Sequence, residues 1–302
     1  MQKARGEPTS RLVQKGTIHM ALSLEKFQKN KEYLICVDSD GCAVDTMDIK
    51  HKRCFGPCIV TEWGLEAWEN EILSRWDEIN LYSMTRGINR FKGLAMMLEE
   101  IHERWTPIEG VETLRRWAEE AKELSNAALE AEIAHNDARI LKKALSWSLA
   151  VNRSITALPW EVKKAFPGVK EGFELARDFA DIAVVSSANR DAVEEEWEKF
   201  GLLPLVDLVL CQDVGSKAHC IAELKKKGYA ADHILMVGDA PGDKAAAETN
   251  GVWYYPILVR HEAESWREFP QAAELLKSGT YQPYGEKKAK EFLENLSGGK
   301  RT

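Results

Sequence analysis

The chain has 302 residues, of which 44% are hydrophobic and 29% are charged, a composition typical of a globular protein with a sizeable core. Its formal net charge of -7 argues against a nucleic acid or an anionic membrane as a partner. It contains neither a run of about 18 apolar residues nor a secretory leader, so we expect a cytoplasmic protein with no membrane contact and with its 6 cysteines as free thiols.

Residues 1–20 are polar, punctuated by Gly and Pro, and lack sustained periodicity. We expect them to be a disordered extension or a tag, outside the fold. Beyond them, five short apolar runs predict buried strands. Polar side chains follow four of these runs, in three cases directly and in one case after a single glycine. The five runs are Leu34–Val37, Ile182–Val185, Leu205–Cys211, Ile234–Val237 and Val252–Ile257.

Segments with helical spacing precede or separate the later strands. They are Val169–Phe179, Arg190–Phe200, Lys217–Lys227 and Asp243–Thr249. This alternation predicts right-handed βαβ crossovers and an α/β fold with a doubly wound parallel sheet, a Rossmann-like core over residues 31–45 and 167–260. Such sheets bind ligands at the carboxyl ends of their strands, which is where the polar motifs of this sequence fall.

Residues 46–166 interrupt the alternation with helical patterns rich in Trp, Leu, Ala, Glu and Lys. We predict an inserted all-helical domain there, with long amphipathic stretches near Leu94–Trp105 and Val111–Val151. Within residues 261–302, the amphipathic stretches Glu262–Lys277 and Glu286–Leu296 predict C-terminal helices that pack on the core. No pattern specifies an oligomeric state.

Two pairs of acidic residues follow predicted strands. Asp38 and Asp40 lie in the sequence DSDG, where the glycine lets the backbone turn sharply out of the strand. Asp239 and Asp243 lie on a loop that opens a helix. Mg²⁺ prefers hard oxygen ligands and is commonly held by one or two carboxylates with phosphate and water. We therefore predict a Mg²⁺ site with Asp38 and Asp239 as direct ligands and the Asp40 backbone carbonyl as a third.

A hydroxyl and an ammonium group accompany these acids. Ser186, with Ser187 beside it, ends a strand and Lys217 opens a helix, so we expect these side chains to contact phosphoryl oxygens. The set permits in-line attack of Asp38 on phosphorus. Asp40, protonated at this step, would give its proton to the leaving alcohol and then, as a carboxylate, take one from the hydrolytic water.

The motifs together resemble those of the haloacid dehalogenase-like hydrolase superfamily. Four appear in the superfamily's order: VDSDG at Asp38, VVSS at Ser186, Lys217, and GDAPGD at Asp239 and Asp243. The resemblance covers the core, about half of the chain. It implies an aspartyl-phosphate on Asp38, a general acid/base at Asp40, phosphate binding by Ser186 and Lys217, and Mg²⁺ near Asp239 and Asp243.

The carboxylate at Asp40 resembles the phosphatase and phosphomutase branches, because the dehalogenase and phosphonatase branches lack an acid there. The insertion between the first two motifs resembles a helical C1-type cap, although it is larger than the compact four-helix form. The third motif departs from the common Lys-Pro pair, since Ala218 follows Lys217. Lys225, Lys226 and Lys227 compete on spacing but fall at the helix end.

We expect a phosphatase of small phosphorylated metabolites. One alternative is a phosphomutase resembling β-phosphoglucomutase, which returns the phosphoryl group to a substrate and requires a bisphosphate activator. Another is a non-catalytic binding relative.

Three further groups of charged or metal-ligating residues lie outside these four motifs. Arg86, Arg90 and Lys92 form a basic, Gly-hinged segment of the cap that either grips an anionic substrate or is a solvated connection. His51, Cys54 and Cys58 have a spacing compatible with a soft metal but lack a fourth ligand, so we expect no metal there. We expect Glu194–Glu196 to be a solvated helix face.

Overall fold

Five parallel strands form one sheet in the computed structural model, which describes residues 23–298. The predicted extension at residues 1–20 lies outside this range. The strands are β1 (Tyr33–Val37), β2 (Ala180–Val185), β3 (Leu208–Leu210), β4 (Ile234–Gly238) and β5 (Trp253–Pro256). Their order is β3-β2-β1-β4-β5, so the carboxyl end of β1 is flanked by those of β2 and β4.

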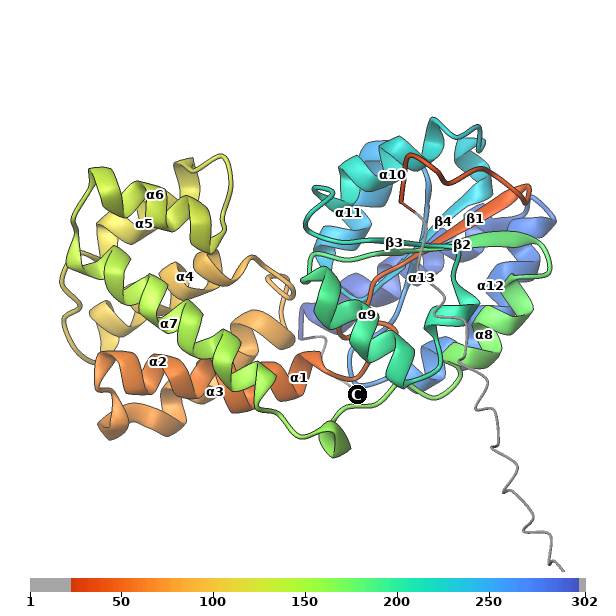
Figure 1. The fold of residues 1–302 in the computed structure, drawn as a ribbon. Helices are drawn as coiled ribbons and strands as arrows, with labels where there is room; N and C mark the ends of the chain where they lie inside the picture. The colour runs from red at the N-terminus through yellow and green to blue at the C-terminus, as the bar shows by residue number, and fades with distance from the viewer. Residues whose placement is uncertain (1–22, 299–302) are drawn as a thin grey trace, which may run out of the picture.

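Helices cover both faces of this sheet (Figure 1). Side chains alternate along a strand, so Ile35 and Val37 face one side while Leu34 and Cys36 face the other. The helices on the first side are α8 (Val169–Ala176), α9 (Arg190–Lys199) and α12 (Glu262–Lys277), and those contributing to the second are α10 (Lys217–Lys225), α11 (Pro241–Asn250) and α13 (Tyr281–Leu296). The predicted doubly wound α/β sheet is confirmed.

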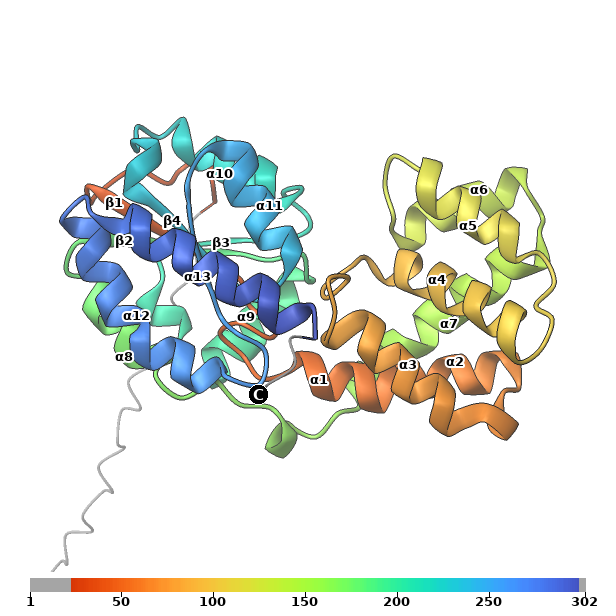
Figure 2. The ribbon, with the colours of Figure 1, turned by 180° about the vertical axis from the view of Figure 1, so that it is seen from behind.

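Between β1 and β2 the chain forms a separate helical body, which we call the cap (Figure 2). It begins with α1 (Met47–Lys50), which continues through a π-helical turn at His51–Phe55. The remaining helices are α2 (Gly56–Trp63), α3 (Glu69–Leu81), α4 (Arg90–Arg104), α5 (Val111–Glu120), α6 (Asn126–His135) and α7 (Arg139–Thr156). The cap has its own hydrophobic core, in which Trp76 and Trp147 are fully buried.

Some predicted elements have different bounds. β3 is shorter than its apolar run, because Leu203–Leu205 forms a 3-10 turn around a proline, which has no N–H for a sheet ladder. The amphipathic stretch Val111–Val151 comprises three helices, because the backbone becomes extended at Ala121 and at Asn136. Helix α13 begins at Tyr281, ahead of the predicted start.

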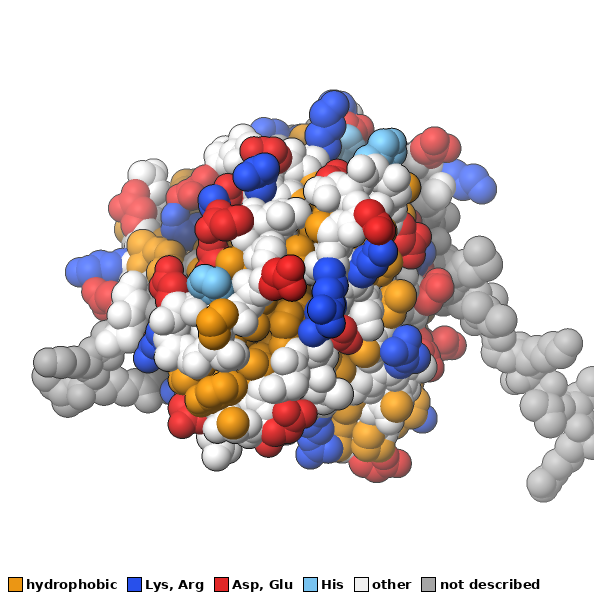
Figure 3. Space-filling view, turned by 90° about the vertical axis from the view of Figure 1, so that its left-hand side faces the viewer, with side chains coloured by type: hydrophobic (Ala, Val, Ile, Leu, Met, Phe, Trp, Pro, Cys, Tyr) orange, Lys and Arg blue, Asp and Glu red, His pale blue; other side chains and the backbone are white. Residues whose placement is uncertain are grey.

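The outer face of the cap carries acidic and basic side chains interspersed with apolar ones, and neither charge gathers into a patch on this face (Figure 3). Over residues 23–298, no helix is both long enough and apolar enough to cross a membrane. The cysteines are free thiols, as predicted.

Candidate active site

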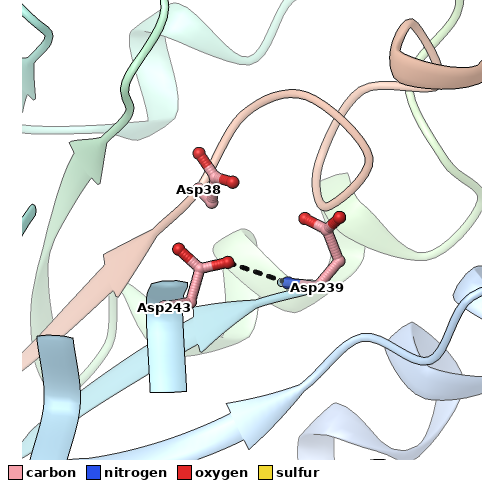
Figure 4. A group of neighbouring side chains, drawn as sticks. All are labelled: Asp38, Asp239 and Asp243. Carbon is pink, nitrogen blue, oxygen red and sulfur yellow. Dashed lines mark hydrogen bonds between the residues drawn. The ribbon is translucent and has the colours of Figure 1, made fainter. Parts of the chain in front are cut away.

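Three carboxylates meet where β1 and β4 end (Figure 4). Val37 of β1 pairs with Val237 of β4, so Asp38 and Asp239 leave the sheet as neighbours, and Asp243 joins them from the first turn of α11. One oxygen of each carboxylate lies within 4.8 Å of the other two, and all three residues are buried. In the described part of the chain, this is the one group of three metal-ligand side chains so close together.

Asp243 is held by hydrogen bonds at both of its oxygens. Its Oδ2 accepts from the backbone N–H groups of Asp239 at 3.1 Å and Ala240 at 3.0 Å, and its Oδ1 accepts from Lys217 Nζ at 2.5 Å. Lys217 also lies 2.7 Å from Asp38 Oδ2. Asp243 therefore fixes the loop of Asp239 and the ammonium group of Lys217, and it stays close to the other two acids as one of three candidate metal ligands.

The acid cluster carries excess buried negative charge. Burial, together with Asp243 and Asp239, raises the pKa of Asp38 to about 8 against the attraction of Lys217. Burial likewise raises the pKa of Asp239 to about 6, although Arg86 opposes it. Asp239 Oδ1 is buried without a hydrogen-bond partner. An unpaired carboxylate oxygen among crowded acids fits a divalent cation with a preference for oxygen ligands.

Asp40 is tied to the base of the cap. Thr46 Oγ1 donates to Asp40 Oδ1 at 2.5 Å, and Lys50 Nζ donates to both carboxylate oxygens at 2.8 and 3.0 Å. Burial alone would raise the pKa of Asp40, but Lys50 and Thr46 outweigh burial and lower the pKa. Asp40 is therefore a carboxylate in this state, and the predicted first step requires a proton that Asp40 does not yet carry.

Lys50 and Glu196 were not identified from the sequence. Glu196 Oε1 lies 3.4 Å from Lys50 Nζ and 3.3 Å from Lys163 Nζ, and Glu196 is buried. This corrects the prediction that Glu194–Glu196 is entirely a solvated face. On α9, Glu196 lies on the same side as Val193 and Trp197, which are in the core, and this i, i+3, i+4 spacing is the signal that marks the buried side.

Ser186 lies at the same edge of the sheet as the acids, and Ser187 does not face inward. Ser186 follows β2, the neighbour of β1, and its N–H donates to Leu210 O at 2.9 Å. Its Oγ accepts from the Ala188 N–H at 3.2 Å, and the residue is buried. Ser187 is exposed.

Of the three basic cap residues, only Arg86 reaches the acids. Its Nε donates to Asp239 Oδ2 at 2.7 Å, and both side chains are 1% exposed. Arg90 instead donates to Asn152 Oδ1 at 2.7 Å within the cap, and Lys92 is exposed.

The histidine and cysteines near the start of the cap do not gather around a metal site. His51 Nδ1 accepts a hydrogen bond from Trp76 Nε1 at 3.1 Å, and its ring stacks on Phe55. Burial lowers the pKa of His51 to about 3, so the ring is neutral. With Cys54 and Cys58 it forms no close group of metal ligands among the described residues.

Gly238, the last residue of β4, leaves no room for a side chain. A Cβ there would lie 2.3 Å from Cγ of the buried Asp243. We expect Gly238→Ala to displace Asp243 and to lower the free energy of unfolding by about 1–3 kcal/mol, the usual cost of overpacking. Urea denaturation beside Gly242→Ala, where no atom lies within 4 Å of the added Cβ, provides the control. Equal stability of the two variants would contradict this reading of the site.

Comparison with known proteins gives one family match. A model of haloacid dehalogenase-like hydrolases matches residues 110–255, which include Ser186, Lys217, Asp239 and Asp243 but not Asp38. No curated protein matches the sequence significantly.

Several solved structures are similar to this chain at low identity. A haloacid dehalogenase-like family hydrolase from Xanthomonas campestris is 14% identical with a TM-score of 0.50, over 84% of this chain and 96% of that one. A predicted phosphoglycolate phosphatase from Haemophilus somnus is 19% identical with a TM-score of 0.45, over 74% and 84%. CbbY from Rhodobacter sphaeroides, in complex with phosphate, is 15% identical with a TM-score of 0.39, over 75% and 86%.

At these identities the likeness to the Xanthomonas protein supports the fold alone. The family match covers three of the four motifs, and β1 brings the first motif, at Asp38, beside them in the sheet. Residues 110–255, nearly half of the chain, are thus similar to the haloacid dehalogenase-like hydrolases.

Proposed function

We propose that this hydrolase is a magnesium-dependent phosphatase of small phosphomonoesters that acts through an aspartyl-phosphate on Asp38. The observation that carries the proposal is the contact of Lys217 Nζ with both Asp38 and Asp243, beside the unpaired oxygen of Asp239. A nucleophilic carboxylate, a cation for phosphoryl oxygens and an open metal-ligand oxygen are thus grouped at one edge of the sheet.

The residues that would hold Mg²⁺ are Asp38 and Asp239, with the backbone carbonyl of Asp40. Asp243 supports them by binding the backbone N–H of Asp239. When bound, the cation offsets the repulsion between the attacking carboxylate and the phosphate anion.

Asp38 would attack phosphorus in line, forming a P–O bond to its carboxylate while the bond to the leaving alcohol breaks. Lys217 neutralises charge on the phosphoryl oxygens and already lies 2.7 Å from the nucleophile, and Ser186 adds a hydroxyl at the same edge. Water then attacks the aspartyl-phosphate, which releases inorganic phosphate and regenerates the Asp38 carboxylate.

Asp40 would move the proton in both steps. Because Asp40 is a carboxylate in this state, the proton for the leaving oxygen would come from the Lys50 ammonium group across their 2.8 Å hydrogen bond. In the second step Asp40 accepts a proton from the attacking water and returns it to Lys50, so the cycle restores both groups.

The cap supports a small substrate. It contacts the catalytic loops through Lys50 and Arg86, and Asp38 and Asp239 are only 6% and 1% exposed with the cap in this position. A site enclosed in this way excludes bulk water from the reacting groups, and it suits a phosphorylated metabolite rather than a macromolecule.

Phosphate release from a panel of sugar phosphates, nucleotides and other phosphorylated metabolites tests the proposal. We expect release to require Mg²⁺, to stop with excess EDTA and to return when Mg²⁺ is added back. Turnover that appears only with a bisphosphate activator would identify a phosphomutase instead. Turnover that persists in EDTA would contradict a metal-dependent mechanism.

A further inference from the structure

Arg86 lies on a turn of the cap that is built independently of the core. The turn joins α3 to α4, and the Arg86 N–H donates to Ser83 O at 2.9 Å while the Gly87 N–H donates to Asn80 O at 3.3 Å. The hydroxyls of Ser83 and Thr85 are hydrogen-bonded to each other at 2.8 Å. Backbone and side-chain bonds within the cap therefore fix where this turn carries Arg86.

Two glycines with positive φ let the turn approach the catalytic loops. A Cβ on Gly87 (φ 69°) would lie 2.9 Å from Ala240 Cβ. A Cβ on Gly41 (φ 80°) would lie 2.6 Å from Arg86 Nη2 and 2.7 Å from Asp239 Oδ2. The guanidinium group thus occupies space that any side chain at Gly41, the last residue of the DSDG motif, would fill.

The contact of Arg86 with Asp239 uses only one carboxylate oxygen. Nε donates to Oδ2 at 2.7 Å, while Nη1 donates to Leu81 O of the cap at 2.8 Å. Asp239 Oδ1 is left buried and unpaired. Since the bond to Leu81 orients the guanidinium plane, Arg86 also orients the carboxylate that it binds.

We propose that Arg86 is a positioning residue for the metal ligand Asp239, so that docking of the cap completes the metal site. The inference rests on the proposed function, because it takes Asp239 as a ligand. Partners that orient a metal ligand typically contribute 10–100-fold to metal affinity. The positive charge of Arg86 acts in the opposite direction by repelling a cation. The orienting effect dominates here, because the Arg86 bond holds Oδ2 and leaves Oδ1 open.

Titration calorimetry of Mn²⁺ or Mg²⁺ into the full-length protein, without substrate, tests this inference. We expect Arg86→Gln to bind the metal about 10–100-fold more weakly than the parent. Arg86→Lys keeps the charge but lacks the second donor for Leu81, so its metal affinity should lie between those of Arg86→Gln and the parent. The control is Arg116→Gln, which removes the same charge from an exposed site on α5 and should leave affinity unchanged.

A second measurement follows the docking of the cap. Small-angle X-ray scattering should show a larger radius of gyration for Arg86→Gln than for the parent or for Arg116→Gln, because the variant loses a buried ion pair between cap and core. Circular dichroism verifies folding, and if Arg86→Gln does not fold, the affinity of Arg86→Lys decides.

Equal or tighter metal binding by the folded Arg86 variant would overturn the inference while leaving the proposed function intact. Asp239→Asn distinguishes the two ideas, since it should abolish binding. A parent protein that binds no metal, or an Asp239→Asn variant that binds like the parent, would overturn the proposed metal site itself.

Discussion

Replacing Asp38 with Asn is expected to lower phosphate release on the order of 10³-fold or more, the scale seen when a nucleophile is removed. The variant keeps the shape of the side chain but cannot form an acyl-phosphate. Lys217 and Asp243 would still contact each other at 2.5 Å, so the fold of the site should persist. The measurement is kcat under saturating Mg²⁺ with the best substrate from the panel.

The same variant should be more stable than the parent in metal-free buffer at neutral pH. The pKa of Asp38 is about 8 in the folded protein, above its ordinary value of 3.8, because burial and the neighbouring acids disfavour its charge. A raised folded-state pKa contributes stability that is present below about pH 4 and lost as pH rises through about pH 8. Asn carries no charge at any pH. The stability of the variant relative to the parent should therefore increase as pH rises from about 4 to about 8, and the difference should vanish below about pH 4.

Thermal unfolding across pH 4–8 in EDTA measures this difference. Asp45→Asn is the matched control, since Asp45 follows the same motif but lies 3.4 Å from Lys164 in a partly exposed pair. Mg²⁺ should reduce the difference in stability between the variant and the parent, because a ligand at 100 times its Kd stabilises the parent by about 2.7 kcal/mol. An Asp38→Asn variant that releases phosphate like the parent would overturn the aspartyl-phosphate mechanism. A variant that is less stable than the parent at pH 8 would contradict the view that the charge of Asp38 destabilises the metal-free site.

The positions of the proposed catalytic acids were predictable from the sequence because they depend on local pattern. An apolar strand followed by a polar turn places Asp38 and Asp239 at strand ends, and parallel strands bring these ends together. Lys217 and Asp243 open helices at the same edge, which the alternation of strands and helices also predicts. The fold of the core was predictable for the same reason.

Contacts between the cap and the core were harder to predict from the sequence. Nothing in the local sequence of Arg86 distinguishes it from Arg90, yet one binds Asp239 and the other binds Asn152 within the cap. The difference arises from the turn between α3 and α4, a tertiary feature. The lowered pKa of Asp40 likewise depends on a residue from another element, Lys50.

Replacing Lys50 with Met should lower the free energy of unfolding by about 3 kcal/mol, because it removes one partner from a buried charge network. Lys50 Nζ contacts both Asp40 and Glu196, and the side chains of Lys50 and Glu196 are 9% and 3% exposed. Glu196 Oε2 already lacks a hydrogen-bond partner, so the loss of Lys50 would leave the Glu196 carboxylate with still fewer partners. Urea denaturation at pH 7 measures the loss.

Lys52→Met is the control for this prediction. Lys52 lies on the same helical stretch and pairs with Asp48 at 2.8 Å, but its side chain is 44% exposed, so its loss should cost less than about 1 kcal/mol. The pH dependence gives a further check. Because Lys50 helps to lower the pKa of Asp40, the Asp40 part of the stabilisation is present above about pH 4 and fades as Asp40 protonates below it.

The effect of Lys50→Met on catalysis separates a proton-transfer role from a purely structural one. If Lys50 supplies the proton that Asp40 delivers, kcat should fall by about 10²-fold, within the range of general acid–base contributions, while KM changes little. Lys50→Arg should restore much of the stability, because the cation remains, but little of kcat, because guanidinium holds its proton too tightly to pass it on. Full activity of a folded Lys50→Met protein would show that Asp40 acts without Lys50, and it would contradict the proposed proton path.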